Sequence, residues 1–329
     1  MSSVLITGAN GFIGRHLVEE AGKHHLHVYA GVRNGSDANV LNNLDCELIY
    51  LDYDDVEKLT SVLSALKPDY IIHNAGLTRS PEYEQYIKVN KNYLIHIVEA
   101  VRKSGIPLKK LLFVSSLAAY GPADFQPEGI VTHDSIPYPV TQYGRSKQEA
   151  ENWLKQQPDI PYNIVRPSAV FGPGEKDLLN VFQMVKKGIN ASAGYGEQKL
   201  TFIYVKDLVR LILSATLTKH THQAYFGTDG QIYGSNDFPE AIARSLGKKI
   251  ISVSLPVGLV RVGAWISEKI GKLTGKFPTL YMERVNEIKA KNWSCDITNL
   301  KSDLQFKAQY SLQQAIDETT AWYLNNKWI

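Results

Sequence analysis

The sequence predicts an α/β fold: a doubly wound parallel sheet with helices on both faces and a smaller, discontinuous C-terminal region. Three observations predict it. Short aliphatic and β-branched runs alternate with helical patterns through the first half of the chain, which is typical of successive βαβ units. Several of these runs are apolar throughout, as in strands that are buried on both faces. A glycine-rich turn joins the first strand to the first helix.

The elements follow one another in the order that right-handed crossovers in a parallel sheet require. Strands are expected over residues 4–7, 27–32, 47–51, 70–74, 111–115 and 162–166. Between them, apolar residues recur at helical spacing, which predicts helices over residues 12–21, 56–66, 86–103 and 142–157.

The pattern loosens after residue 166, where prolines and glycines punctuate a loop and later elements are less regular. A strand over 200–203 and a helix over 206–216 are regular enough to rejoin the sheet. We therefore expect a sheet domain that covers residues 1–167 and roughly 202–232. A smaller region is expected over roughly 168–201 and 233–329.

Composition excludes several classes of protein. The 329 residues include 44% hydrophobic and 21% charged residues, as in globular proteins, and a net charge of +3 is too weak for a nucleic-acid footprint. With only Cys46 and Cys295, neither a disulfide framework nor a metal site is expected. This usage fits a reducing compartment, and without a visible targeting segment we expect a soluble, cytoplasmic protein.

The most hydrophobic later segment spans residues 253–270 and is interrupted by Arg261, Glu268 and Lys269. Its apolar residues recur at helical spacing, which predicts an amphipathic helix rather than a membrane span. We expect this helix to dock on the protein's own core.

The turn after the first strand has the glycine pattern G-x-x-G-x-x-G, at Gly8, Gly11 and Gly14. Glycine at these places permits a tight turn and lets backbone N–H groups approach a pyrophosphate. The helix that follows supplies partial positive charge to phosphates. Because this turn opens a βαβ series, it predicts a dinucleotide-binding site rather than an ordinary loop.

Arg33 follows the second strand, about 20 residues beyond the last glycine, where dinucleotide folds place the group that reads the adenine ribose. A guanidinium there pairs with a 2′-phosphate and stacks on adenine, which favours NADP over NAD. Asp37 lies close by in the sequence and would favour NAD, and a solvated loop charge is the alternative for Arg33.

Tyr143 and Lys147 lie four residues apart and share one face of a predicted helix. A neighbouring cation favours the phenolate and lowers the pKa of a tyrosine that otherwise titrates near 10. The same spacing occurs at Tyr195/Lys199 and Tyr323/Lys327, in a predicted loop and in the C-terminal tail. Only Tyr143 follows the fifth strand, whose end carries Ser115 and Ser116, so we select this pair.

With these residues together, the chain resembles the extended short-chain dehydrogenase/reductase superfamily, the NAD(P)-dependent epimerase/dehydratase group, over nearly its full length. Further ordered matches are Leu51-Asp52, His73-Asn74-Ala75-Gly76, Val89-Asn90, Ser115-Ser116-Leu117-Ala118-Ala119-Tyr120-Gly121, Arg166-Pro167, Val170-Phe171-Gly172-Pro173-Gly174 and Phe202-Ile203-Tyr204-Val205-Lys206-Asp207-Leu208. The resemblance implies a Rossmann domain followed by a substrate-binding region.

The resemblance also implies roles for single residues. Tyr143 would be the general acid/base toward a carbonyl oxygen, and Ser116 would hydrogen-bond the same oxygen. Lys147 would hold the nicotinamide ribose and lower the pKa of Tyr143, while Asn90 would either support the nicotinamide or be an ordinary helix residue. The expected cofactor contacts are Gly8, Asn10, Gly11, Phe12, Ile13, Gly14, Arg33, Asp52, Asn74, Ala75, Gly76, Ser115, Tyr143, Lys147 and Pro167.

Three activities of the superfamily differ at positions that this sequence shows. Sugar 4,6-dehydratases carry an Asp-Glu pair after the serine or threonine, where this chain has Leu117 and Ala118. Nucleotide-sugar enzymes usually grip the diphosphate with an arginine at the place of Leu200. Lys199 is adjacent, but neighbouring residues of a strand point to opposite faces.

We therefore favour an NADP-dependent carbonyl reductase or alcohol dehydrogenase acting on a small-molecule ketone or secondary alcohol. A nucleotide-sugar epimerase with a retained NAD is the alternative, and a non-catalytic NADP-binding regulator is the third hypothesis. The C-terminal region resembles the dihydroflavonol-reductase-like and 3β-hydroxysteroid-dehydrogenase-like branch. The superfamily commonly forms a homodimer through the helix that carries Tyr143. Residues 79–86 are expected to form a polar surface loop rather than a substrate wall.

Overall fold

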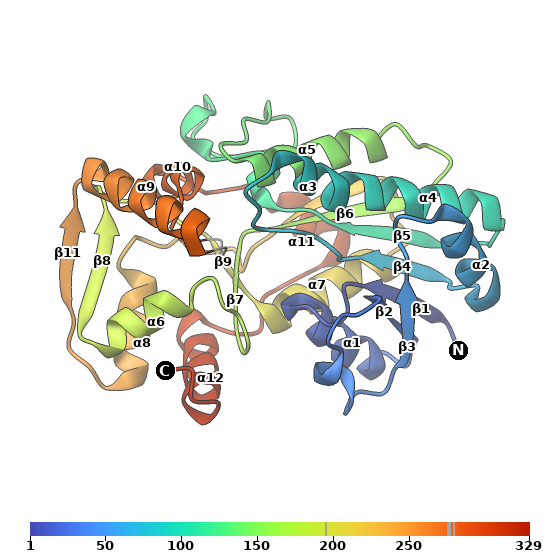
Figure 1. Ribbon diagram of the computed structural model, residues 1–329, viewed down its shortest axis with the longest axis horizontal. Helices are drawn as coiled ribbons and strands as arrows, with labels where there is room; N and C mark the ends of the chain where they lie inside the picture. Colours follow the sequence, from blue (N-terminus) through green and yellow to red (C-terminus); the bar gives the residue numbers. More distant parts are fainter. Residues whose placement is uncertain (195, 275–277, 279) are drawn as a thin grey trace.

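The computed structural model describes residues 1–194, 196–274, 278 and 280–329. Its centre is a seven-stranded parallel sheet with the order β10-β6-β5-β4-β1-β2-β3 (Figure 1). The order reverses at β1, and sheets of this kind bind ligands at such a switch point. The strands are β1 (Ser3–Thr7), β2 (His27–Arg33), β3 (Glu47–Leu51), β4 (Tyr70–His73), β5 (Lys110–Val114), β6 (Tyr162–Pro167) and β10 (Gln223–Gly227).

Helices cover both faces of the sheet, which confirms the doubly wound α/β prediction (Figure 1). On one face α1 (Phe12–Lys23) packs against α7 (Val205–Leu217). On the other face α2 (Val56–Leu66) packs against α4 (Tyr93–Ser104), and α5 (Gln142–Leu154) lies beside them. The six strands predicted over residues 4–166 all agree with the observed ones to within one residue at each end.

Two apolar clusters fill the space between the sheet and its helices. Leu5 and Ile71 belong to the cluster under α2, α4 and α5, whereas Ile6 and Ile72 belong to the one under α1 and α7. Successive residues of a strand point to opposite faces, so a strand buried on both sides must be apolar at every position. This is why the strand runs are continuous in the sequence.

Two predicted elements differ from the structure. The helix predicted over 86–103 is divided into α3 (Tyr83–Ile87), a π-helical turn (Lys88–Asn92) and α4, because one turn is widened around Asn90. The strand predicted over 200–203 does not rejoin the main sheet. Instead β9 (Phe202–Tyr204) pairs with β7 (Ala169–Phe171), since β10 already occupies the place beside β6.

The rest of the chain forms a smaller region at the carboxyl ends of the strands. In it, β8 and β11 make a two-stranded sheet, and α12 packs on α8. Figure 1 shows β8, β11, α9 and α10 together at the end of the molecule away from the N-terminus. The elements are α6 (Leu179–Lys186), β8 (Ile189–Ala193), α8 (Asp237–Leu246), β11 (Ile251–Leu255), α9 (Val257–Thr274), α10 (Met282–Lys289), α11 (Thr298–Leu304) and α12 (Leu312–Asn325).

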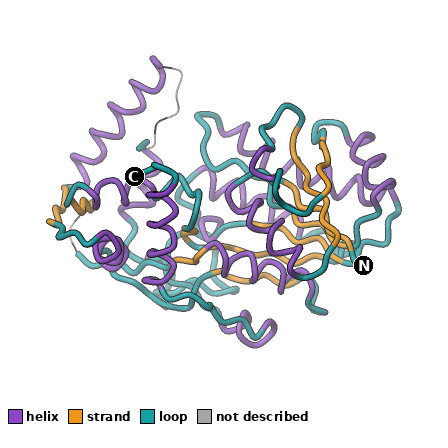
Figure 2. Tube along the Cα trace, turned by 90° about the horizontal axis from the view of Figure 1, so that it is seen from below, coloured by secondary structure: helices purple, strands orange, loops and turns teal. Residues whose placement is uncertain are grey.

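The amphipathic helix expected over 253–270 is α9, which starts after Pro256 because residues 251–255 are extended as β11. Our expectation that its apolar side docks on the core is wrong. The side chains of Leu259, Ile266 and Ile270 are exposed on α9, which projects from the body as the helix that ends in the grey trace of Figure 2. Among the described residues, no helix has the length and apolarity needed to cross a membrane.

Candidate active site

A cavity of about 520 Å³ lies at the carboxyl ends of the central strands. Its wall is formed by the N-terminus of α1, the segments after β4 and β5, helix α5 and, from the smaller region, helix α10. Loops at this end of a parallel sheet converge on its switch point. The predicted site residues that line the cavity are Phe12, Ile13, Asn74, Gly76, Ser115, Ser116, Tyr143, Lys147 and Pro167.

The glycine turn between β1 and α1 is a close-packed cradle. Gly8 has φ +64°, and a Cβ there would lie 2.9 Å from the Cα of Ala75. A Cβ on Gly14 would lie 2.1 Å from the carbonyl oxygen of Gly8. Neither position accepts a side chain, and Gly11 gives α1 no side-chain cap. The first N–H groups of α1 are therefore presented to an anion, as a pyrophosphate site requires.

Thr7 ties this turn to the segment that follows β4. Its hydroxyl oxygen accepts from the backbone N–H groups of Asn74 (3.1 Å) and Ala75 (3.0 Å). The same hydroxyl lies 3.0 Å from Nδ1 of His73, whose pKa burial lowers to about 3. Nδ1 of a neutral imidazole can accept a hydrogen bond from the Thr7 hydroxyl. This contact fixes the end of β4 beside the cradle.

The predicted adenine-side residues lie along the neighbouring edge. Arg33 is exposed at the end of β2 and pairs in register with Leu51 of β3, which Asp52 follows directly. Asn10 donates to the carbonyl oxygen of Asp37 (2.9 Å), which anchors the loop after β2 to the glycine turn. The Asp37 carboxylate accepts from the backbone N–H of Asn39 (2.9 Å), so it is engaged within its own loop.

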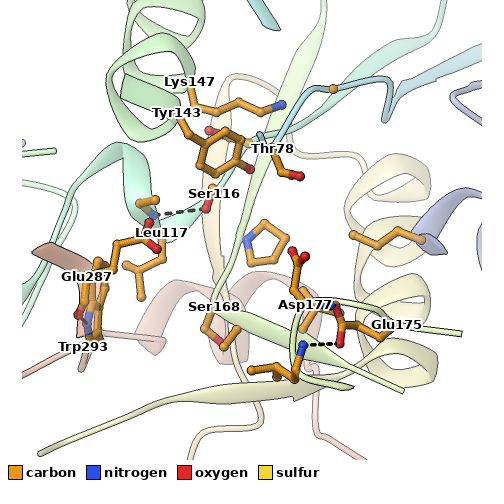
Figure 3. A pocket seen from close by; sticks show the side chains of 18 of the residues that line it. Thr78, Ser116, Leu117, Tyr143, Lys147, Ser168, Glu175, Asp177, Glu287 and Trp293 are labelled. Atoms are coloured by element: carbon orange, nitrogen blue, oxygen red, sulfur yellow. Dashed lines mark hydrogen bonds between the residues drawn. The ribbon is translucent and has the colours of Figure 1, made fainter. Parts of the chain in front are cut away.

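Ser116, Tyr143 and Lys147 meet at the middle of the cavity (Figure 3). Ser116 caps a short helix by accepting from the N–H of Ala118 (3.1 Å), and its side chain lies beside the phenol of Tyr143 in the cavity wall (Figure 3). Lys147 is 3% exposed, and its Nζ donates to the carbonyl oxygen of Val114 (2.9 Å). The arrangement places two hydroxyls side by side, where both can reach one carbonyl oxygen.

The pKa shifts of this pair follow from burial. Burial raises the pKa of Tyr143 to about 12; the neighbouring Ser116 side chain opposes this shift, and the charges of Glu287 and Asp177 add to it. Burial also lowers the pKa of Lys147 to about 7, against the attraction of Glu151. We expected Lys147 to lower the pKa of Tyr143. In this structure the net shift of Tyr143 is upward, because the protein that surrounds the phenol displaces part of its solvation, and this desolvation is the largest cause.

Asn90 lies behind the cavity rather than in its wall. Its amide group accepts from the N–H of Leu77 (2.8 Å) and donates to the carbonyl of Leu77 (3.0 Å) and to Oγ of Ser146 (2.9 Å). A Cβ on Gly76 would lie 3.3 Å from both Asn90 Oδ1 and Lys147 Nζ. Asn90 therefore positions the loop and the helix on either side of Lys147.

The Tyr323/Lys327 pair does not form a comparable site. Tyr323 is fully buried in α12, and its hydroxyl donates to the carbonyl oxygen of Glu175 (2.8 Å). Lys327 is exposed beyond the end of that helix. Tyr195 lies outside the described residues.

The wall opposite Tyr143 carries charges that the sequence analysis did not identify. Arg79 pairs with Asp177, and Arg284 pairs with Glu287 on α10 (3.0 Å). Glu175 accepts from the N–H groups of Asp177 and Leu178, and burial raises its pKa to about 7. Our expectation that 79–86 is a surface loop is wrong for Arg79, which lines the cavity. No local motif marks these residues, since 98 positions separate the first pair.

Comparison with known proteins agrees with this geometry. The model of the NAD dependent epimerase/dehydratase family matches residues 4–225. The chain belongs to the NAD-dependent epimerase/dehydratase family. The extended short-chain dehydrogenase/reductase assignment is thereby confirmed, and with it the reading of the chain as an enzyme of that type.

Individual relatives of the family cover the whole chain. An N-acetyl-α-D-glucosaminyl-diphospho-ditrans,octacis-undecaprenol 4-epimerase of Escherichia coli O157:H7 is 28% identical, over 96% of this chain and 94% of the relative. A ceramide reductase of Caulobacter vibrioides is 24% identical, over 99% and 96%. The crystal structure of the Thermotoga maritima UDP-glucose 4-epimerase with UDP-glucose has a TM-score of 0.79 at 20% identity, over 99% of each chain.

The cradle fits the dinucleotide of this NAD-dependent family. Gly8 and Gly14 leave the backbone bare, α1 begins without a side-chain cap, and the cavity runs from Phe12 and Ile13 to Lys147. Gly8, Gly11 and Gly14 would hold the phosphates, and Lys147 would hold the nicotinamide ribose. The bound cofactor gives or accepts the hydride, while the chain supplies position and the proton.

Two family positions in the cavity wall are apolar. Leu117 and Ala118 line the cavity. These are the positions that the resemblance compares with the Asp-Glu pair of sugar 4,6-dehydratases. Leu200 also lines the cavity, whereas Lys199 is exposed and its backbone forms a parallel β-bridge with Asn292. The two neighbouring side chains therefore point to opposite sides, as predicted, and Lys199 does not enter the cavity wall.

Proposed function

We propose that this chain is an NADP-dependent oxidoreductase that reduces a ketone, or oxidises the corresponding secondary alcohol, with Tyr143 as the proton donor or acceptor. The observation that carries the proposal is the placement of Ser116 and Tyr143 side by side in a cavity that reaches the cofactor cradle. A carbonyl oxygen between these hydroxyls brings its carbon to the end of the cavity where Lys147 would hold the nicotinamide ribose.

The residues of the chain perform three tasks in the reductive direction. Ser116 donates a hydrogen bond to the carbonyl oxygen and so polarises the C=O bond. Tyr143 gives its proton to that oxygen as the carbon gains a hydride, and the product is the neutral alcohol. Because burial raises the pKa of Tyr143 to about 12, the phenol is protonated at neutral pH and ready to act as an acid.

The charges of the wall favour a substrate without a diphosphate. Arg79 and Arg284 are each paired with a carboxylate, and Leu200 takes the place of the family's gripping arginine. The oxygens of a diphosphate need cations or N–H donors in place of water, and both of these arginines are already engaged by carboxylates. The relative named a ceramide reductase, 24% identical to this chain, supports the proposal as an example of reduction on a substrate that is not a nucleotide sugar.

The epimerase alternative is supported by the 4-epimerases among the relatives. One assay separates the two functions. The purified protein is incubated with NADPH and a panel of aryl, alicyclic and long-chain ketones, and separately with UDP-glucose, and any cofactor released on denaturation is identified. We expect freely exchanging NADPH to be oxidised in step with ketone loss. Tightly retained NAD together with isomerised UDP-glucose, and no ketone reduction, would establish the epimerase instead.

Replacement of Arg33 tests the preference for NADP. We expect Arg33→Ala to weaken NADPH binding roughly ten- to hundredfold, the worth of a hydrogen bond to a charged group, and to leave NADH binding unchanged. Binding is measured by fluorescence titration of both cofactors. Arg102→Ala removes another exposed guanidinium, paired with Asp159 far from the glycine turn, and serves as the control. Equal affinities of the wild-type protein for NADPH and NADH would rule out the preference.

A further inference from the structure

The outer side of α9 carries an apolar stripe that packs on nothing. Its members are spaced three or four residues apart, so they share one face of the helix. Leu273 is 88% exposed and Leu259 is 61% exposed. Amphipathic helices of globular proteins normally bury such a stripe against the core. We call this surface the α9 face; it consists of Leu259, Val262, Ile266, Ile270 and Leu273.

The opposite side of α9 holds the helix to the protein. Ala264 is fully buried, and Glu268 lies one turn further along the same side. The carboxylate of Glu268 accepts from the backbone N–H of Met282, the first residue of α10 (2.8 Å). The inner side of α9 is therefore anchored on α10, and the α9 face points away from that anchor, as Figure 2 shows for the helix as a whole.

The charges around the α9 face are basic. Lys269 is exposed on α9 three residues after Ile266, and its Nζ lies 5.6 Å from the ring centroid of Trp265, which is itself exposed; Arg261 is exposed near the N-terminal end of α9, on the side of Ala264. Lys248 and Lys249 are exposed just before β11. Glu268 is the one acidic residue of the sequence from 248 to 274, and it turns inward.

The small sheet at the N-terminal end of α9 also exposes its apolar side chains and pairs its polar ones. Ile251, Val253 and Leu255 alternate along β11 and are all exposed. The intervening Ser252 and Ser254 hydrogen-bond Asn190 and Ser192 of β8 on the other side. Polar groups are thus paired within the sheet while apolar ones face outward.

We propose that the α9 face and the adjoining edge of β11 dock on the surface of a lipid bilayer that contains anionic headgroups. An interfacial helix has this composition: aliphatic side chains and a tryptophan on one side, Lys and Arg beside them, and no acid facing outward. The basic residues are complementary to anionic lipids. A second copy of this chain is disfavoured as the occupant, because a two-fold interface would bring the same basic residues together.

Docking in this way sets the active-site cavity close to the lipid. α10 packs on α9 with one side, and its residues Arg284, Glu287 and Ile288 line the cavity with the other, together with Tyr281 just before the helix. One helix therefore separates the bilayer surface from the cavity wall.

The test is flotation of the full-length protein with vesicles. The two lipid probes are phosphatidylcholine alone and phosphatidylcholine mixed with phosphatidylglycerol. We expect the wild-type protein to float with the mixed vesicles, and to do so less at high salt because screening weakens the basic contacts. We expect Leu259→Gln/Ile266→Gln/Ile270→Gln to lower this binding by roughly tenfold or more. Arg261→Glu/Lys269→Glu should lower it on the mixed vesicles only.

A matched control removes exposed apolar side chains from other elements. Val40→Gln/Leu217→Gln/Leu324→Gln changes three such residues outside β8, β11 and α9, and should bind vesicles as the wild type does. Circular dichroism and NADPH binding check that each variant is folded. The proposal is overturned if the wild type binds neither vesicle, or if the α9 triple variant binds as well as the wild type. It is also overturned if light scattering shows that the triple substitution splits a wild-type dimer, since a second copy would then cover the face.

Discussion

Tyr143→Phe is expected to lower kcat for ketone reduction by roughly a thousandfold, the typical worth of a positioned general acid. The substitution removes only the phenolic hydroxyl and leaves Ser116 in the cavity wall. NADPH binding should be unchanged, because the glycine turn and Lys147 are untouched. Steady-state rates with the best ketone of the panel, together with NADPH titration, measure both effects.

Tyr86→Phe is the matched control for this loss. The ring of Tyr86 lies 6.4 Å from that of Tyr143, and its hydroxyl accepts from the backbone N–H of Ser80 (2.8 Å). Tyr86 is buried beside Tyr143 and is not among the residues that line the cavity, so activity should fall by less than about tenfold. Equal losses in the two variants would remove Tyr143 from the proposed role.

The pH dependence of the wild type should differ between the two directions. Reduction needs the protonated phenol, and the raised pKa of Tyr143 keeps it protonated through the neutral range, so that rate should not fall as pH rises from 6 to 9. Oxidation of the alcohol needs the phenolate, so its rate should rise steadily over the same interval. A reductive rate that collapses above neutrality would show that the proton comes from a group of lower pKa.

Glu151→Leu is expected to lower the free energy of unfolding by about 3–5 kcal/mol, because it leaves a buried guanidinium without a counter-ion. Glu151 and Arg166 are each 1% exposed, and their side chains meet at 2.7 Å. Burial opposes ionisation of Glu151, but Arg166, Lys155 and a hydrogen bond from Ser115 together hold its pKa below the usual value. Urea unfolding followed by fluorescence measures the loss.

Two further variants separate this effect from a general weakening of α5. Glu149→Gln breaks the partly exposed pair between Glu149 and Lys91 (3.0 Å) on the same helix, and should cost less than about 1 kcal/mol. Glu151→Leu/Arg166→Met removes both buried charges and should recover most of the lost stability. A double variant as unstable as Glu151→Leu would show that packing, rather than the uncompensated charge, is responsible.

The sheet could be predicted from sequence because its determinants are local. A strand buried on both faces must be apolar at each position, and this holds for residues 111–114 whatever surrounds them. The glycine turn and the Tyr143/Lys147 pair could be found in the same way, since seven or fewer residues carry each pattern. The position of Phe202–Tyr204 could not, because which strand takes the sheet edge depends on competition with a later segment.

The sequence by itself determined the fold class and the family, and it selected the residues that we propose to carry the proton and to hold the cofactor. Only the tertiary structure decided the surroundings of those residues. The pKa of Tyr143 moves upward because segments far apart in the sequence surround and desolvate the phenol, and Arg79 meets Asp177 because two distant loops fold against each other. The same is true of α9, whose amphipathic pattern is written in the sequence but whose apolar side faces outward. Periodicity fixes which residues share a face; what packs on that face depends on the rest of the chain.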